Sequence, residues 1–172
     1  MRVKQARASH GRQTLTTALL SVVLICLSCT VSAAETSYRV DLSERAMQQV
    51  NIEARFSDVT GDTLDFHLPV WRSGLYLVLD FVGTVSGLEV NDENGEARDV
   101  VVRYRVYADS LSDRTRHVDT EHAFLNPAAV FVYADQLRDQ PVELTIDLPD
   151  GWQAASGMEQ PDSGRFVAPH YD

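Results

Sequence analysis

Hydrophobic and polar residues alternate along most of the chain after residue 34, with the period of strands that bury one face. Residues 50–56 alternate Val, Ile, Ala and Phe with Asn, Glu and Arg. Residues 64–68, 100–108 and 142–148 repeat this pattern with Leu, Val, Phe, Tyr and Ile in the apolar positions. The alternation predicts four strands, each with one face toward a core.

Short polar segments separate these strands. Residues 58–62, DVTGD, predict a hairpin connection, and residues 91–95, NDENG, predict another turn. Helix signals are weak: residues 45–49 predict one helical turn, and the Val, Phe and Tyr of residues 128–137 predict a strand followed by a turn. Many short strands without a long amphipathic helix predict an all-β fold, an antiparallel β-sandwich, in a single domain over residues 34–172.

Residues 1–33 have the pattern of a secretory signal peptide. A basic start precedes an apolar run over residues 15–31, and small residues at 31–34 suit a cleavage site. A retained membrane anchor is the alternative, which the short run with its Ser and Thr residues disfavours. Cleavage predicts a periplasmic or secreted protein with no membrane attachment. Both cysteines, Cys26 and Cys29, would leave with the leader, so the remaining domain could form no disulfide.

The charge of the chain excludes some partners. Four of its fifteen basic residues precede Ala34, so eleven arginines accompany all twenty-five acidic residues after that point, a balance of −14. A surface this acidic repels phosphate, so we predict that neither nucleic acid nor an anionic membrane surface is a partner.

Metal-ligand residue types gather at one place: His117, Asp119, Glu121 and His122. The spacing H-x-x-x-E-H is one residue longer than the inverted zinc motif H-x-x-E-H. In an extended segment His117, Asp119 and Glu121 share one face, and His122 points to the other. The pattern favours a solvated polar surface and no metal ligand set; a weak metal site or a substrate-facing acidic patch is the alternative.

Aromatic residues offer a second set of candidates. Trp71 follows a turn at Pro69, and Tyr76 lies five positions further along. Burial as core anchors is the favoured interpretation, and a sugar-binding platform made by Trp71 and Tyr76 with Tyr104 and Tyr107 is the alternative. No serine elbow or phosphate-binding glycine loop is present, so no catalytic or cofactor-binding residue is predicted. Trp71 and Tyr76 join the four polar residues as candidates for a substrate-facing or interdomain surface.

Residues 64–81, LDFHLPVWRSGLYLVLDF, resemble the LPxWxPGxY segment in the amino-terminal domain of the glycyl-aminopeptidase family of zinc metallopeptidases, peptidase family M61. Further pieces follow in the order that this resemblance implies. They are YRVYADSLSDRTRHVDTEHAFLN from Tyr104, VFVYA from Val130, ELTIDLPDGW from Glu143 and FVAPHYD from Phe166. Several pieces in the expected order make the resemblance specific.

The resemblance implies a non-catalytic β-domain that packs against a catalytic domain, in cis or in trans, and helps shape its substrate cleft. The family holds zinc on a downstream H-E-x-x-H helix, and this motif is absent from the sequence. Zinc would therefore belong to the catalytic domain. A peptide substrate would be a further partner of this chain. This chain would be a fragment or one partner of a split enzyme. The alternative is a free-standing extracytoplasmic sandwich that binds a peptide or a glycan.

Two departures from the family pattern carry expectations of their own. Ser73 and Leu75 stand where the family tends to have Pro and Ser, which loosens the turn around Gly74. The link from Glu96 to Val100 is shorter than the corresponding family segment, which usually contains another strand and a tryptophan. A missing strand predicts an exposed edge on the sheet.

Overall fold

The computed structural model describes residues 36–69, 82–94, 98–112 and 115–172. The predicted signal peptide at residues 1–33 lies outside this part of the chain. None of the helices within the described ranges has the length and apolar character needed to cross a bilayer. The cleaved leader and the location outside the cytoplasm stay predictions.

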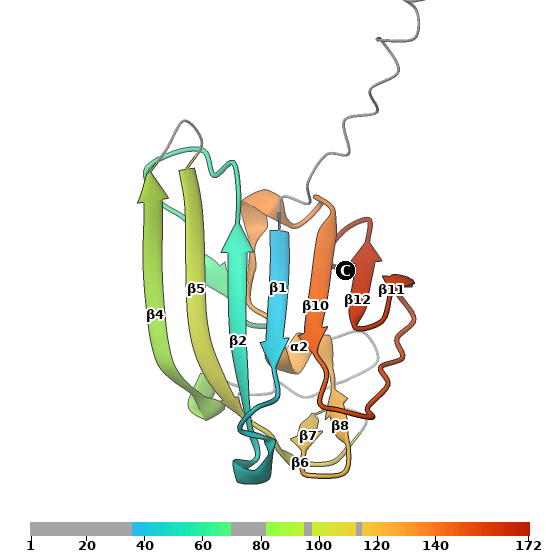
Figure 1. The fold of residues 1–172 in the computed structure, drawn as a ribbon. Helices are drawn as coiled ribbons and strands as arrows, with labels where there is room; N and C mark the ends of the chain where they lie inside the picture. Colours follow the sequence, from blue (N-terminus) through green and yellow to red (C-terminus); the bar gives the residue numbers. More distant parts are fainter. Residues whose placement is uncertain (1–35, 70–81, 95–97, 113–114) are drawn as a thin grey trace, which may run out of the picture. The chain divides into compact units, whose positions relative to one another are not determined.

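Seven strands form one large sheet in the order β11-β12-β10-β1-β2-β5-β4 (Figure 1). Their bounds are β1 Thr36–Asp41, β2 Gln49–Phe56, β4 Val85–Asn94, β5 Arg98–Tyr107, β10 Val142–Asp147, β11 Glu159–Asp162 and β12 Arg165–Ala168. β1 runs parallel to β10, and the other neighbouring strands of this sheet are antiparallel. The all-β prediction is confirmed. The predicted antiparallel arrangement is corrected for one pair: the sheet is mixed because its central strand, β1, runs parallel to β10.

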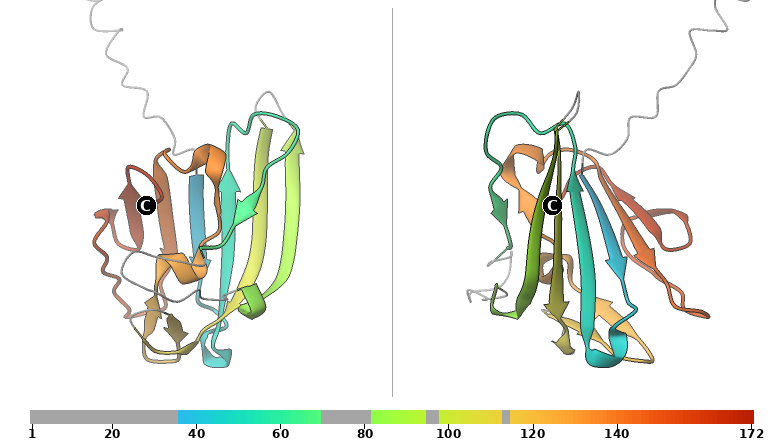
Figure 2. Two further views of the ribbon diagram at one scale, coloured as in Figure 1. Left: turned by 180° about the vertical axis from the view of Figure 1, so that it is seen from behind. Right: turned by 60° about the vertical axis from the view of Figure 1, so that its left-hand side comes forward.

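Two smaller sheets and several short helices accompany the large sheet in the described ranges. One sheet pairs β3 with β9, and the other contains β6, β7 and β8. The bounds are β3 Phe66–His67, β6 Asp109–Ser110, β7 Arg116–Val118, β8 Ala123–Leu125, β9 Tyr133–Ala134, η1 Arg45–Met47, η2 Val82–Thr84, α2 Pro127–Val130 and η3 Asp135–Leu137. Figure 2 shows α2, β9, η3 and β3 over one face of the large sheet. We call residues 127–137 the cover segment.

The sheet face beneath the cover segment carries the hydrophobic core. On β2 the predicted alternation is confirmed, since Val50, Ile52, Ala54 and Phe56 are buried and the residues between them are only partly buried. β1, β5, β10 and β12 add buried residues to the same cluster. Removing apolar surface from water contributes roughly 25 cal/mol per Å², so burial of this face is the main force that holds the domain together.

The opposite face of the sheet is polar and carries ion pairs between neighbouring strands. Arg39 on β1 lies 2.7 Å from Asp147 on β10, and Arg103 on β5 lies 2.8 Å from Glu53 on β2. Pairs this exposed contribute at most about 1 kcal/mol each. Because opposite charges face each other across the strands, the pairs favour the observed register.

Two tyrosine hydroxyls bind the cover segment to the core. Tyr104 Oη donates to Val130 O at 2.8 Å and accepts from Val132 N at 3.1 Å. Tyr38 Oη donates to Val132 O at 2.6 Å. Burial raises the pKa of both tyrosines above the ordinary value, because the phenolate form would lose its hydration. Both side chains are therefore neutral donors.

The predicted strand at residues 128–137 is wrong at its start, where α2 begins. Asn126 Oδ1 accepts a hydrogen bond from Ala128 N at 3.1 Å, and Pro127 occupies the first turn. Asn at the N-cap and Pro at the first helical position are start signals that outweigh the β-propensity of the residues that follow. The helical turn predicted at residues 45–49 is confirmed by η1.

Residues 58–62 do not return the chain onto β2, so the predicted hairpin is wrong. β2 already pairs with β1 on one side and with β5 on the other. With both edges of β2 occupied, β3 pairs with β9 instead. The predicted inward set of Leu64, Phe66 and Leu68 does pack against the core. The alternation thus identified the side chains that face the core, which are partly buried, but not the partner strand.

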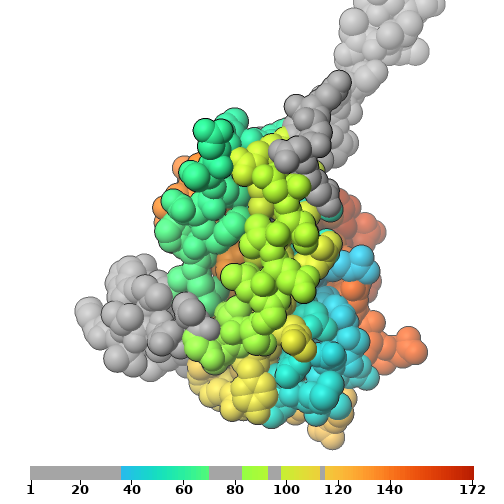
Figure 3. Space-filling model, turned by 90° about the vertical axis from the view of Figure 1, so that its left-hand side faces the viewer, coloured from blue at the N-terminus to red at the C-terminus, as the bar shows by residue number. Residues whose placement is uncertain are grey.

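The large sheet ends at β4, an edge strand with exposed apolar side chains. Leu88 is 62% exposed and Val90 is 53% exposed. Figure 3 looks onto this edge. β4 pairs with β5 as far as Asn94, so the turn predicted at residues 91–95 is wrong for residues 91–94, and residue 95 lies outside the described residues. Because any open sheet has edge strands, this edge does not test whether a strand is missing before Val100, and that expectation stays a prediction.

We expect Tyr104→Phe to lower the free energy of unfolding by about 1–3 kcal/mol, because Val130 O and Val132 N would stay buried without a partner. Urea denaturation followed by circular dichroism measures the loss. Tyr107→Phe is the matched control, since Tyr107 lies on the other face of β5, is 44% exposed and has a hydroxyl that donates, in an exposed hydrogen bond, only to the Gln48 side chain among the described residues. Equal losses in the two variants would contradict a stabilising role for the Tyr104 hydroxyl.

Candidate functional site

The four polar candidates lie in the β7–β8 hairpin at one end of the large sheet (Figure 1). β7 ends at Val118 and β8 begins at Ala123, and these two residues pair directly. Residues 119–122 therefore form the connection. A second hydrogen bond fixes β7 to the residue that follows β5, since Val118 N donates to Ala108 O at 2.9 Å. The hairpin is thus fixed to the end of the large sheet.

The Asp119 side chain organises the connection. Its Oδ1 accepts hydrogen bonds from the backbone N–H of Glu121 at 2.7 Å and of His122 at 2.8 Å. The backbone N–H of Asp119 donates to His122 O at 3.0 Å. Such local bonding of an aspartate to the following backbone is typical of turns. The N–H groups of His122 and Glu121, and then the His117 ring, hold the pKa of Asp119 well below its usual range.

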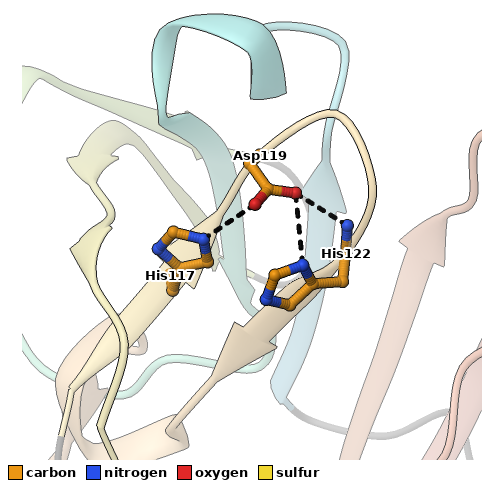
Figure 4. A group of neighbouring side chains, drawn as sticks. All are labelled: His117, Asp119 and His122. Carbon is orange, nitrogen blue, oxygen red and sulfur yellow. Dashed lines mark hydrogen bonds and ion pairs between the residues drawn. The ribbon is translucent and has the colours of Figure 1, made fainter.

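Both imidazole rings meet this carboxylate (Figure 4). His117 Nε2 lies 3.1 Å from Asp119 Oδ2, and His122 Nδ1 lies 3.3 Å from Asp119 Oδ1. The two ring centroids are 5.0 Å apart. The His117 side chain is 14% exposed and the His122 side chain 50% exposed. Two imidazoles facing one carboxylate can share a proton with it or bind a cation.

The structure changes the predicted arrangement of these residues. His122 was expected on the face opposite His117, and this is wrong because the chain turns at Asp119 instead of continuing as a strand. The side chain of Glu121 is exposed and lies outside the group, to which it contributes only its backbone N–H. Trp71 and Tyr76 lie outside the described residues, so their roles stay predictions.

Three rings, from His67, Tyr133 and Tyr171, form a stack that the sequence did not predict. The Tyr133 ring lies 5.5 Å from the His67 ring and 4.9 Å from the Tyr171 ring, measured between centroids. The Arg138 guanidinium lies 5.1 Å from the Tyr133 centroid and donates two hydrogen bonds of 2.6 Å to Asp172. These bonds raise the pKa of Arg138 and lower that of Asp172.

The same stack closes over the cover segment and borders a cavity. Tyr171 Oη donates to Phe131 O at 2.8 Å, and Tyr171 N donates to Arg138 O at 3.0 Å. Beside these rings lies a cavity of about 910 Å³, whose apolar wall includes Leu144 and Met158. The only local signal for this arrangement was the FVAPHYD ending, because the stacked residues are far apart in the sequence.

Comparisons with known proteins give a consistent result. The family model described as Peptidase M61 N-terminal domain matches residues 37–100 and 93–172. A crystal structure of an aminopeptidase N family protein from Idiomarina loihiensis is similar, with a TM-score of 0.69 and 26% sequence identity. The similarity covers 79% of this chain and 27% of that chain. No curated protein matches.

The lowered pKa of Asp119 predicts a pH dependence of stability. The charged carboxylate stabilises the fold above the unfolded-state pKa of about 3.8, and this contribution is lost as the pH falls toward the lower folded-state pKa. We expect the stability advantage of the wild type over Asp119→Asn to shrink as the pH falls below about 5. Urea denaturation at a series of pH values measures this difference.

Glu121→Gln is the control for this prediction, because it removes a neighbouring negative charge from outside the group. Its stability difference from the wild type should be small throughout. A wild-type advantage over Asp119→Asn that persists unchanged at the lowest pH would contradict the role of the charged carboxylate.

Proposed function

Because the chain belongs to peptidase family M61, whose amino-terminal domain it matches over most of its length, we propose that it is the non-catalytic β-domain of a metalloaminopeptidase-like protein. In this role it packs against a catalytic domain and shapes one side of the substrate cleft. The family match carries the proposal. The similar Idiomarina protein is much longer, since this chain spans only 27% of it.

Zinc and the general base would come from the catalytic domain, in the same chain or in a partner chain. The sequence contains no H-E-x-x-H motif. His117, Asp119 and His122 lie on a hairpin and not on the helix that this motif requires, so they do not fit the peptidase zinc site. We assign no step of peptide hydrolysis to residues of this chain.

One end of the domain has the character of a docking surface. Most of the large hydrophobic side chains that are exposed in the described structure belong to elements at this end. They are Met47 in η1, Tyr107 at the end of β5, Leu111 after β6 and Phe124 in β8. We call this set the apolar end. Exposed apolar patches on soluble domains mark interaction surfaces, and the catalytic domain is the occupant that family membership supplies.

We call the β7–β8 hairpin, with His117, Asp119 and His122, the histidine hairpin. It lies at the same end, so its polar side chains would border the contact. The last residues of the family match are also fixed, because Arg138 holds Asp172 and Tyr171 bonds to the cover segment. A domain that followed Asp172 would start from a defined position on the sheet. The position of the hairpin and the fixed chain end both support a catalytic domain that packs closely against this domain rather than one that is loosely tethered to it.

A binding experiment tests the proposal. The chain is mixed with a family M61 catalytic domain from the same genome that has been produced without its own amino-terminal domain. We expect no cleavage of aminopeptidase substrates by the chain alone, a one-to-one complex in analytical ultracentrifugation, and a higher kcat/KM in the mixture. Absence of a complex, with kcat/KM unchanged, would refute packing against a catalytic domain.

Substitutions on the apolar end test where the catalytic domain docks. Phe124→Ser and Leu111→Ser should each weaken the complex by at least about tenfold, or ~1.4 kcal/mol, because each removes an apolar anchor. Val90→Ser on β4 is the matched control, since Val90 is an exposed aliphatic residue on a different edge. If Val90→Ser alone weakened the complex, the docking surface would be β4 and not the apolar end.

The cavity favours a second candidate, a free-standing module that binds a peptide or a glycan. Its volume of about 910 Å³ and its lining of Tyr133, His67 and Arg138 suit a small ligand with apolar and polar groups. This candidate requires a ligand-dependent rise in Tm without any catalytic domain. The rise should disappear in Tyr133→Ala.

A further inference from the structure

The three side chains of the histidine hairpin are spaced as ligands of one ion. His117 Nε2 and His122 Nδ1 lie 3.1 Å and 3.3 Å from the two oxygens of Asp119. The three ligand atoms lie within 4.8 Å of one another. Zn²⁺ binds imidazole nitrogen and carboxylate oxygen at about 2.0–2.2 Å, which separates neighbouring ligands in a tetrahedron by about 3.4 Å. Small side-chain rotations would bring all three groups to one centre.

We propose that His117, Asp119 and His122 bind a divalent transition-metal ion of the Zn²⁺ class. Two imidazoles with one carboxylate favour Zn²⁺, Ni²⁺ or Cu²⁺ over Mg²⁺ and Ca²⁺, which prefer sites made only of oxygen ligands. The half-exposed His122 leaves the remaining coordination positions open to solvent. This proposal does not depend on the proposed packing against a catalytic domain.

The hairpin holds most of the site in place before an ion binds. Asp119 is fixed by the N–H groups of Glu121 and His122, and His117 lies within the β7 ladder. Figure 4 shows both rings directed at the carboxylate. Binding therefore has to order little beyond the His122 ring, which keeps its entropic cost low.

The environment of His117 sets the expected strength of the site. Its Nε2 faces Asp119, one of the other two ligands. Its Nδ1 is buried without a hydrogen-bond partner in the described structure. Metal-bound histidines usually donate their second nitrogen to an acceptor, and the loss of such a partner lowers metal affinity. Binding in the micromolar range is the expected result. The ion would join the end of β7 to the start of β8 and stabilise the hairpin.

Calorimetric titration of the chain with ZnCl₂, without a histidine tag or chelating buffer, tests the proposal. We expect one Zn²⁺ per chain and a Tm that rises with the Zn²⁺ concentration. His122→Gln, a change at an exposed position, should weaken binding by at least about tenfold. Glu121→Gln should bind normally because its carboxylate lies outside the group. His67→Gln should also bind normally, since His67 lies 3.5 Å from the Asp135 carboxylate and belongs to no group of three metal-ligand residues in the described ranges.

Each other result counts against the site. No saturable binding of Zn²⁺, or equal binding by the wild type and His122→Gln, would overturn the proposal. Loss of binding in Glu121→Gln with retention in His122→Gln would move the ion to another group. Equal binding of Mg²⁺ at this hairpin would overturn the assigned metal class. Failure of the chain to bind a catalytic domain would leave this proposal intact, because the titration uses the chain alone.

Discussion

The closed core depends on hydrogen bonds from tyrosine hydroxyls to consecutive carbonyls of the cover segment. Tyr104, Tyr171 and Tyr38 donate to the carbonyls of residues 130, 131 and 132 in that order. The donors come from β5, the end of the chain and β1, which are widely separated in the sequence. A buried carbonyl without a partner costs about 1–3 kcal/mol. These bonds therefore allow an irregular segment to lie on the apolar face of the sheet.

The sequence could predict the features that depend on neighbouring residues. Alternation identified the inward side chains of β2 and β5, and the large sheet buries that face. It could not identify partner strands, because pairing depends on which edges remain open. The parallel β1–β10 pair and the β3–β9 pair are both of this kind. The helix α2 shows a different limit, since the Asn126–Pro127 start signal overrides β-propensity.

At the candidate site, too, the sequence predicted what neighbouring residues determine and not what the folded arrangement determines. Residue types alone identified His117, Asp119, Glu121 and His122 as candidates, but which of them meet depends on a turn made by the Asp119 side chain itself. Reading the segment as extended placed His122 on the wrong face. The FVAPHYD ending was the only local signal for the stack of Tyr133 and Tyr171, since its contacts form only after the chain end returns to the cover segment. Sites made by long-range contacts require the fold.

The parallel pairing of β1 with β10 also determines when the domain can fold. Arg39 on β1 and its partner Asp147 on β10 are 108 positions apart in the sequence. A growing chain can pair β1 with β2 early, but the other edge of β1 stays open until β10 has been made. Contacts this distant in sequence close late and slow the folding reaction. The ribosome must therefore synthesise nearly the whole domain before its central strand has both neighbours.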